Sequence, residues 1–349
     1  MDKHDWHNQV QEDILEPELK ICDPHHHLWD VPERPERRYL LPELLDDLNS
    51  GHNVVSTVFM ECLSMYRAHG PSALRPVGET EFVNGVAAMS ASGLYGGARI
   101  CASIISYADL NLGTEAGVVL DAHQAASPRF KGIRHASGWD ASEGVRNSHT
   151  DPFQHMLADS RFRKGFAELG RRGLTFDAWL YHPQIPELTA LANAFPDQLI
   201  VLDHFGGPLG IGQYTGKRDS IFNSWKKSIN ALARCQNVYA KLGGLVMPIN
   251  GFGFHKRDRP PDSEQLANAT RDYYLHMIDR FGPDRCMLES NFPVDKTSCS
   301  YAVLWNAFKR ITKNFSPSEK SALYHDTAAS VYGLNDLPYT HAPGKTISG

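Results

Sequence analysis

The sequence predicts a single-domain α/β protein whose core is a distorted (β/α)8 TIM barrel. Short apolar runs rich in β-branched residues alternate with longer amphipathic segments, a pattern that indicates a parallel sheet with helices between its strands. Eight such runs occur, which is the number that closes this barrel. The chain of 349 residues is 42% hydrophobic and 21% charged, an ordinary globular composition, and it is long enough to bury one large core.

The predicted strands follow one another at regular intervals along the chain. In order, they cover residues 19–27, 54–61, 98–105, 130–136, 174–181, 199–204, 238–245 and 286–291. Amphipathic segments predict helices over residues 79–92, 114–126, 151–170, 185–195, 219–236, 263–281, 299–315 and 317–332. One domain, residues 1–349, accounts for all of these elements, and residues 1–17 and 338–349 are expected to be peripheral tails.

The first predicted strand ends in three consecutive histidines. Because side chains on a strand alternate between its faces, His25 and His27 are expected to point the same way and His26 the opposite way. Two convergent neutral imidazoles can hold a divalent metal, or they can orient a substrate carbonyl and a water molecule. A solvated histidine cluster is the alternative interpretation of this short motif.

Polar side chains recur where the later strands are predicted to end, which is where the active site of such a barrel forms. Ionisable groups are seldom buried without a partner or a purpose, so their recurrence at one end of the barrel predicts an active site there. Strands 1 and 8 become neighbours when the barrel closes, which places Asn291 beside His25 and His27, whereas His204 must reach in from the far side. The full set after strand 1 is Glu61, Arg134, His135, His182, Gln184, Asp203, His204, Lys241, Glu289, Asn291 and Asp295.

Composition indicates which kinds of binding partner and which compartment the protein has. The formal net charge is -5 and long runs of Lys or Arg are lacking, which argues against a nucleic-acid surface and favours a small-molecule substrate. About 18 consecutive apolar residues occur nowhere, so no membrane span is expected, and the polar amino-terminal segment predicts a cytoplasmic protein. The six cysteines are widely spaced with no C-x-x-C pair, which fits buried thiols in a reducing compartment. A homo-oligomer is compatible with these features.

Three motifs resemble those of the amidohydrolase-related (amidohydrolase 2) family of metal-dependent-hydrolase-like barrels, in its branch of sugar-lactone and pyrone lactonases. D-P-H-H-H-L-W-D at residues 23–30 is similar to the start of that branch, L-D-H-F-G-G-P at 202–208 to its strand-6 motif, and Y-A-K-L-G-G-L at 239–245 to its strand-7 motif. The resemblance covers nearly the whole chain. It departs at strand 8, where S-N-F-P at 290–293 stands in place of an S/T-D-W-P motif whose Asp is a metal ligand or general base.

The resemblance implies a hydrolase that opens a lactone or cyclic ester by attack of water on the carbonyl. It implies that His25, His27 and His204 are active-site residues and the ligands of one divalent metal, Zn²⁺ or Mn²⁺. Because Asn291 brings no charge to the site, a metal-independent reaction is the alternative. The residues expected to be catalytic are His25, His27, His204, Asn291 and Glu61, and those expected to bind substrate are Arg134, His182, Gln184, Lys241 and Asp295.

Several assignments stay open at this point. Asn291 cannot act as a base, so the base is Glu61, His182 or Asp295, each of which could equally have a structural role. Arg134 is interpreted as the anchor of a substrate carboxylate, with an ion pair to Glu61 as the alternative. Related barrels also run decarboxylase or hydratase reactions on aromatic or unsaturated acids, and a non-catalytic barrel is a third interpretation, against which the retained histidines argue.

Overall fold

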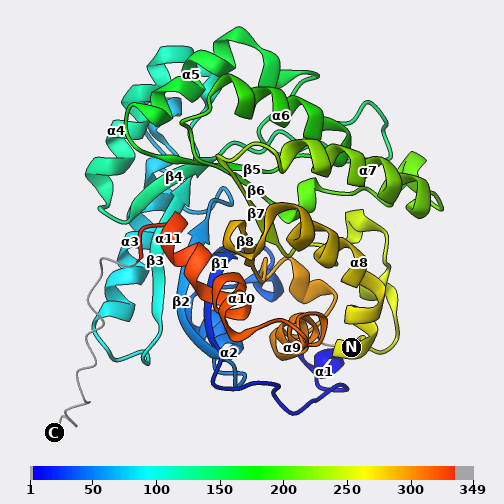
Figure 1. Ribbon diagram of the computed structural model, residues 1–349. Coiled ribbons are helices and arrows are strands. Elements are labelled where there is room, and N and C mark those ends of the chain that lie inside the picture. The colour runs from blue at the N-terminus through cyan, green and yellow to red at the C-terminus, as the bar shows by residue number, and fades with distance from the viewer. Residues whose placement is uncertain (1–2, 335–349) are drawn as a thin grey trace, which may run out of the picture.

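The computed structural model of the protein describes residues 3–334 and confirms the predicted barrel (Figure 1). Its eight strands form one parallel sheet in the order of the sequence, from β1 to β8. The strands are β1 (Lys20–His26), β2 (Asn53–Met60), β3 (Arg99–Ser106), β4 (Phe130–Arg134), β5 (Thr175–Ala178), β6 (Ile200–Leu202), β7 (Val238–Leu242) and β8 (Cys286–Leu288).

The barrel closes between its first and last strands just beyond the end of β8. His26 forms an isolated parallel bridge with Phe292, and the backbone N–H of His27 donates to the carbonyl of Phe292 at 2.8 Å. The backbone N–H of Asn291 donates to the carbonyl of His25 at 2.9 Å. Asn291 therefore lies beside the strand that carries the paired histidines, as the closed barrel predicts.

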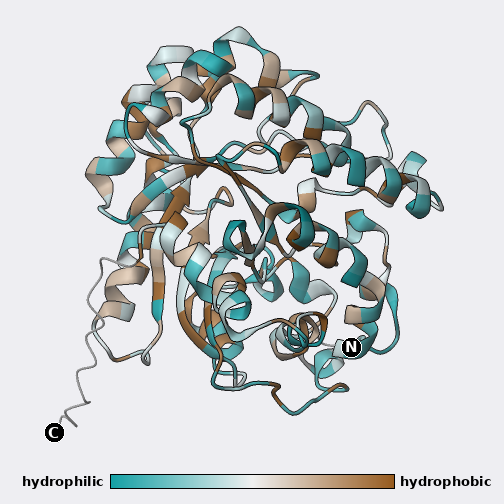
Figure 2. Cartoon of the chain, in the orientation of Figure 1, coloured by the Kyte–Doolittle hydropathy of each residue, from teal (hydrophilic) through white to brown (hydrophobic). Residues whose placement is uncertain are grey.

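Helices surround the barrel and carry their apolar faces toward it (Figure 2). The sequence did not predict α2, which connects β1 to β2, and it predicted a helix from residue 151, whereas α5 begins at Ser160. Asp159 caps α5 by accepting from the backbone N–H groups of Arg161 and Phe162, so residues 135–159 form a long loop. The helices are α1 (Lys3–His7), α2 (Leu41–Leu48), α3 (Val77–Ala91), α4 (Ala116–Ala126), α5 (Ser160–Gly170), α6 (Ile185–Ala194), α7 (Arg218–Leu232), α8 (Ser263–Phe281), α9 (Tyr301–Ile311), α10 (Pro317–Ser321) and α11 (Thr327–Val331).

The last helix covers the amino ends of the strands. Thr327 on α11 donates to the carbonyl of Pro283 shortly before β8, and Arg99 at the start of β3 donates to the carbonyl of Leu334. Tyr332 is fully buried in the barrel interior, where its hydroxyl donates to Asp177 Oδ1 at 2.6 Å. This packing fills the lower barrel, so a substrate can approach only from the carboxyl ends of the strands.

The amino-terminal segment is more firmly attached than the sequence suggested. Residues 3–17 were expected to be peripheral, but the backbone N–H of Leu15 donates to Asn306 on α9, and Lys309 on the same helix donates to the carbonyls of Leu15 and Glu16. The other predicted tail, 338–349, lies outside the described residues. Within residues 3–334, none of the helices is both long and apolar enough to span a membrane.

Candidate active site

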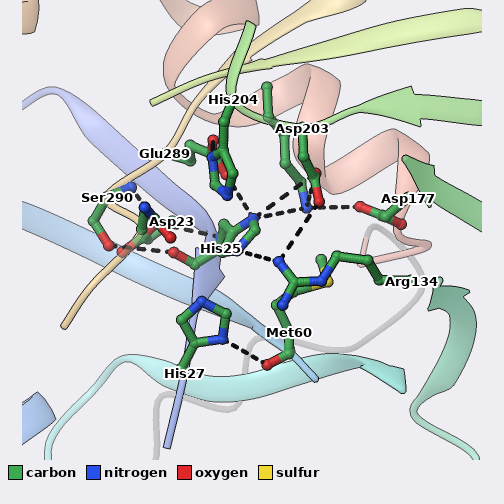
Figure 3. Close-up of polar contacts among 12 residues, drawn as sticks. Asp23, His25, His27, Met60, Arg134, Asp177, Asp203, His204, Glu289 and Ser290 are labelled. Atoms are coloured by element: carbon green, nitrogen blue, oxygen red, sulfur yellow. Dashed lines mark hydrogen bonds and ion pairs between the residues drawn. The ribbon is translucent and has the colours of Figure 1, made fainter. Parts of the chain in front are cut away.

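Three histidines converge at the carboxyl ends of the strands (Figure 3). The ring centroid of His25 lies 5.0 Å from that of His27 and 4.4 Å from that of His204. His27 follows β1 directly and His204 follows β6, so the barrel geometry brings together residues nearly 180 positions apart. All three side chains are buried. His26 points elsewhere, with Nε2 at 2.9 Å from Thr57 Oγ1, as strand alternation predicts.

A carboxylate joins these imidazoles from the end of β8. Glu289 Oε1 accepts from His204 Nδ1 at 2.6 Å, and Glu289 Oε2 lies 2.8 Å from His25 Nδ1. Ligand atoms of His25, His204 and Glu289 all lie within 4.8 Å of one another. His27 is not part of this group; its Nδ1 lies 2.9 Å from the carbonyl oxygen of Met60.

Two glycines after β7 make room for this group. A Cβ atom on Gly244 would lie 2.4 Å from Nδ1 of His204, and one on Gly243 would lie 2.3 Å from Cγ of Glu289. Gly244 also has φ of +69°, a left-handed conformation that favours glycine. The G-G pair at 243–244 is therefore required by the site as well as by the turn.

Two cations flank His25. Arg134 Nη1 lies 3.3 Å from His25 Nε2, and Lys241 Nζ lies 3.4 Å from His25 Nδ1. Lys241 is fully buried between two carboxylates, 2.7 Å from Asp177 and 3.4 Å from Asp203. Opposing acids outweigh the effect of burial and raise the pKa of Lys241, which keeps the ammonium charged.

The guanidinium of Arg134 is hydrogen-bonded to Glu61. Its Nε donates to Glu61 Oε1 at 2.7 Å and its Nη2 donates to the Glu61 carbonyl at 2.6 Å. The ion pair that the sequence left as an alternative is therefore present. Only 7% of the Arg134 side chain is exposed, so a substrate carboxylate could reach the guanidinium only over a small face.

The buried histidines are neutral near physiological pH. Burial lowers the pKa of His25 and of His27 well below the ordinary value, and the neighbouring cations Lys241 and Arg134 add to this effect. Burial likewise lowers the pKa of His204 to about 3. Neutral imidazoles keep a lone pair available, which is the state needed for ligating a metal or accepting a proton.

The charge balance of the site favours a cation. Burial raises the pKa of Glu289 well above its usual range and that of Asp203 to about 6, so both resist ionisation as they stand. Among the described residues, Glu289 Oε2 and both oxygens of Asp203 form no hydrogen bond, although Glu289 Oε2 lies 2.8 Å from His25 Nδ1 and Asp203 Oδ1 lies 3.4 Å from Lys241 Nζ. Buried carboxylate oxygens with unused lone pairs beside two imidazole nitrogens fit a divalent metal with nitrogen and oxygen ligands. The carboxylate that Asn291 lacks is thus offered by Glu289, two residues earlier in the segment that follows β8.

Other predicted residues lie away from the three histidines. Gln184 ties backbone groups together by accepting from the N–H groups of Trp139 and Tyr181 and donating to the carbonyl of Ser137. His182 Nδ1 accepts from the N–H of Leu209 at 3.3 Å. These contacts organise the loops after β4, β5 and β6. No contact between either side chain and the histidine cluster is found among the described residues.

Asn291 and Asp295 form a pair behind the site. Asn291 Nδ2 donates to Asp295 Oδ1 at 3.2 Å, and the Asp295 carboxyl also accepts from the backbone of Gly244 and Val246. Burial raises the pKa of Asp295 well above its usual range, with the charge of Glu289 adding to the effect. The pair connects the β7 and β8 loops, on which Gly244 and Glu289 lie.

Two residues of the site received no role from the sequence. Glu289 was placed at the end of strand 8 without a function, although period-2 alternation puts it on the same face as Asn291. His149 lies in the loop 135–159, and its Nε2 is 3.1 Å from Glu61 Oε2. The sequence predicts residues 137–150 as a connection between a strand and a helix, and no periodicity in a connection indicates where a residue such as His149 lies.

Comparison with known proteins agrees with the resemblance. An uncharacterized protein, y4mH, of Sinorhizobium fredii is 34% identical over 334 residues, which cover 90% of this chain and 99% of that protein. An L-fucono-1,5-lactonase of Burkholderia multivorans is 28% identical over 180 residues, 51% of this chain and 58% of that enzyme. An amidohydrolase structure from the same species, with bound zinc, has a TM-score of 0.68 at 23% identity and covers 90% of this chain and 99% of that one, which supports the fold. Because the amidohydrolase family profile matches residues 22–334, this chain belongs to the amidohydrolase family.

Proposed function

We propose that this amidohydrolase-family protein opens a lactone or related cyclic ester of a small carboxylated or hydroxylated molecule, by attack of water on the carbonyl. The observation that carries the proposal is the convergence of neutral imidazoles and fixed cations at one open barrel end: His25 lies between Arg134 and Lys241 and beside His204. The relative named L-fucono-1,5-lactonase supports a lactone over other esters.

The chemistry of ester opening matches these groups. The carbonyl oxygen gains negative charge as water attacks, and preorganised positive charge stabilises that state in a site with little water. Arg134 and Lys241 provide two such charges within 3.4 Å of the His25 ring nitrogens. Both cations are held by buried carboxylates, so they need not reorganise during the reaction.

The group formed by His25, His204 and Glu289 would hold one divalent metal, Zn²⁺ or Mn²⁺. Such an ion would supply Lewis acidity toward the carbonyl when bound. The neighbouring residues His27 and Asp203 have other roles. His27, locked by Met60, forms a wall of the site next to His25, and Asp203 balances the charges of Lys241 and Arg134.

The test is a panel of sugar-acid lactones, acidic pyrones and neutral lactones, assayed for acid release with metal-stripped and metal-loaded protein. We expect acid release from at least one lactone, and a loss of about 10²-fold or more in His25→Ala, His27→Ala or His204→Ala, the scale on which one positioned catalytic group contributes. Release of CO₂ from an aromatic acid would instead support a decarboxylase, and wild-type turnover in all three variants would contradict the site assignment.

A further inference from the structure

Opening a lactone requires a group that accepts a proton from water and returns it to the ring oxygen. The three bases that the sequence left open are poorly suited. Burial opposes ionisation of Glu61, but Arg134 and His149 outweigh it and hold the pKa of that carboxyl at about 2, too low for an efficient base at neutral pH. His182 and Asp295 are committed to loop contacts, as described above.

His149 has the accessibility that those groups lack. Its side chain is 23% exposed, whereas Glu61 beneath it is fully buried. An ionised carboxylate only accepts hydrogen bonds, so the contact between Glu61 Oε2 and His149 Nε2 places the proton on Nε2. His149 Nδ1 then keeps its lone pair, and none of the described residues forms a hydrogen bond with it. Glu61 thereby fixes the tautomer of His149, as a carboxylate does in a catalytic dyad.

The loop around His149 is held in place. The backbone N–H of Ser148 donates to the carbonyl of Gly138 at 2.8 Å, and Thr150 Oγ1 donates to the carbonyl of Ala136. Tyr181 donates to the carbonyl of Arg146. These bonds fix the loop on both sides of His149, which is the support that a functional side chain on a loop requires.

Glu61 also connects His149 to the histidine cluster. Its Oε1 accepts from Arg134 Nε at 2.7 Å, and Arg134 Nη1 lies 3.3 Å from His25 Nε2. His149 is therefore two side chains from His25, on the solvent side of the buried charges. The other titratable group that influences His149 is His135, at the end of β4, whose pKa burial lowers to about 4.

We propose that His149 is the general acid–base residue of the site, a role that rests on the proposed lactone opening. His149 Nδ1 takes one proton from water as the water oxygen forms a bond to the carbonyl carbon. The bond from that carbon to the ring oxygen then breaks, and the same proton passes from Nδ1 to the ring oxygen. Water and lactone give one hydroxy acid, and His149 returns to its starting state.

The test compares His149→Asn with His155→Asn. His155 lies on the same loop and also contacts a glutamate, Glu187 at 2.9 Å, but its side chain is 67% exposed. Its φ of +63° is a conformation that Asn tolerates, so the control variant should fold. We expect His149→Asn to lower kcat about 10²-fold with KM little changed, and His155→Asn to behave as wild type in kcat and Tm.

Leaving-group dependence separates proton transfer from a structural role. An ester that releases an acidic phenol needs little protonation of its leaving group but still needs a base for the attacking water. His149→Asn should therefore lose less activity with an aryl ester than with an alkyl lactone, which needs both proton transfers. The bell-shaped pH dependence of kcat/KM should also lose one limb. A loss that is equal on both substrates, together with a lower Tm, would overturn the proposal. Wild-type turnover in His149→Asn would overturn it while leaving lactone hydrolysis intact, whereas a wild-type protein that opens no lactone would overturn both.

Discussion

Lys241 should be essential to the folded barrel because it neutralises two buried acids. Its ammonium is fully buried, 2.7 Å from Asp177 and 3.4 Å from Asp203. Replacing Lys241 by Met keeps most of the side-chain volume but leaves buried carboxylates without their cation. Breaking a buried pair on one side costs about 3–5 kcal/mol, which should lower Tm by several degrees. The surface pair of Lys320 with Glu16 provides the control, since Lys320→Met should cost about 1 kcal/mol or less.

The loss in Lys241→Met should depend on pH and on Asp177. Burial, with the charge of Asp177 adding, raises the pKa of Asp203 to about 6 even with Lys241 present, and without Lys241 the Asp203 carboxyl should bind a proton in the folded state. Because the folded state then holds more protons than the unfolded state, stability should fall faster with rising pH than in wild type. Adding Asp177→Asn should recover part of the loss. Thermal melts between pH 6 and 8 measure the stability of Lys241→Met, of Asp177→Asn and of the double variant. A loss of stability in Lys241→Met under about 1 kcal/mol, or one that simply adds to the loss in Asp177→Asn, would refute this reasoning.

Four other predictions concern the metal ligands, Gly244, Arg134 and the buried carboxyl of Glu79, which accepts from the backbone N–H groups of Cys62 and Ser64 just after Glu61. Elemental analysis should find at most one divalent ion per chain, removable by a chelator and reduced in Glu289→Gln; two tightly held ions would contradict the single group of ligands. Gly244→Ala should lower activity by displacing His204, and unchanged kinetics would show that the site tolerates the added Cβ. Burial, with the charge of Glu61 adding, raises the pKa of Glu79 to about 8. Wild type should therefore lose stability relative to Glu79→Gln as pH rises from about 4.5 to 8, by up to about 1.4 kcal/mol per pH unit. A stability difference that does not change with pH would refute this. Arg134→Lys should raise KM for an acidic lactone more than for its neutral ester, and equal losses would remove the carboxylate-anchor role.

The sequence was sufficient to predict the barrel but not where its strands end. Each strand begins within one residue of its predicted start, because apolar β-branched runs mark buried parallel strands clearly. From β4 onward the strands end two or three residues before their predicted ends. There the backbone leaves the extended conformation to direct side chains into the site, as His204 and Asn291 do with φ of +51° and +55°.

The site could be predicted only in part. Period-2 alternation and the H-x-H motif place His25 and His27 together, and barrel closure brings His204 to them. Glu289 received no role because the family's strand-8 motif has its Asp at the position of Asn291, although alternation along the predicted strand 286–291 puts both residues on one face. His149 could not be found, since no periodicity positions a residue within the loop 135–159, and its contact with Glu61 depends on long-range packing.

The most direct test of lactone hydrolysis at this site is to trace the oxygen of water. A lactone that the protein opens would be hydrolysed in H₂¹⁸O and the product analysed by mass spectrometry after fragmentation. Attack of water on the carbonyl carbon predicts one ¹⁸O in the new carboxylate and none in the new hydroxyl group. Label in the hydroxyl group, or CO₂ as the product instead of a hydroxy acid, would contradict the proposed reaction.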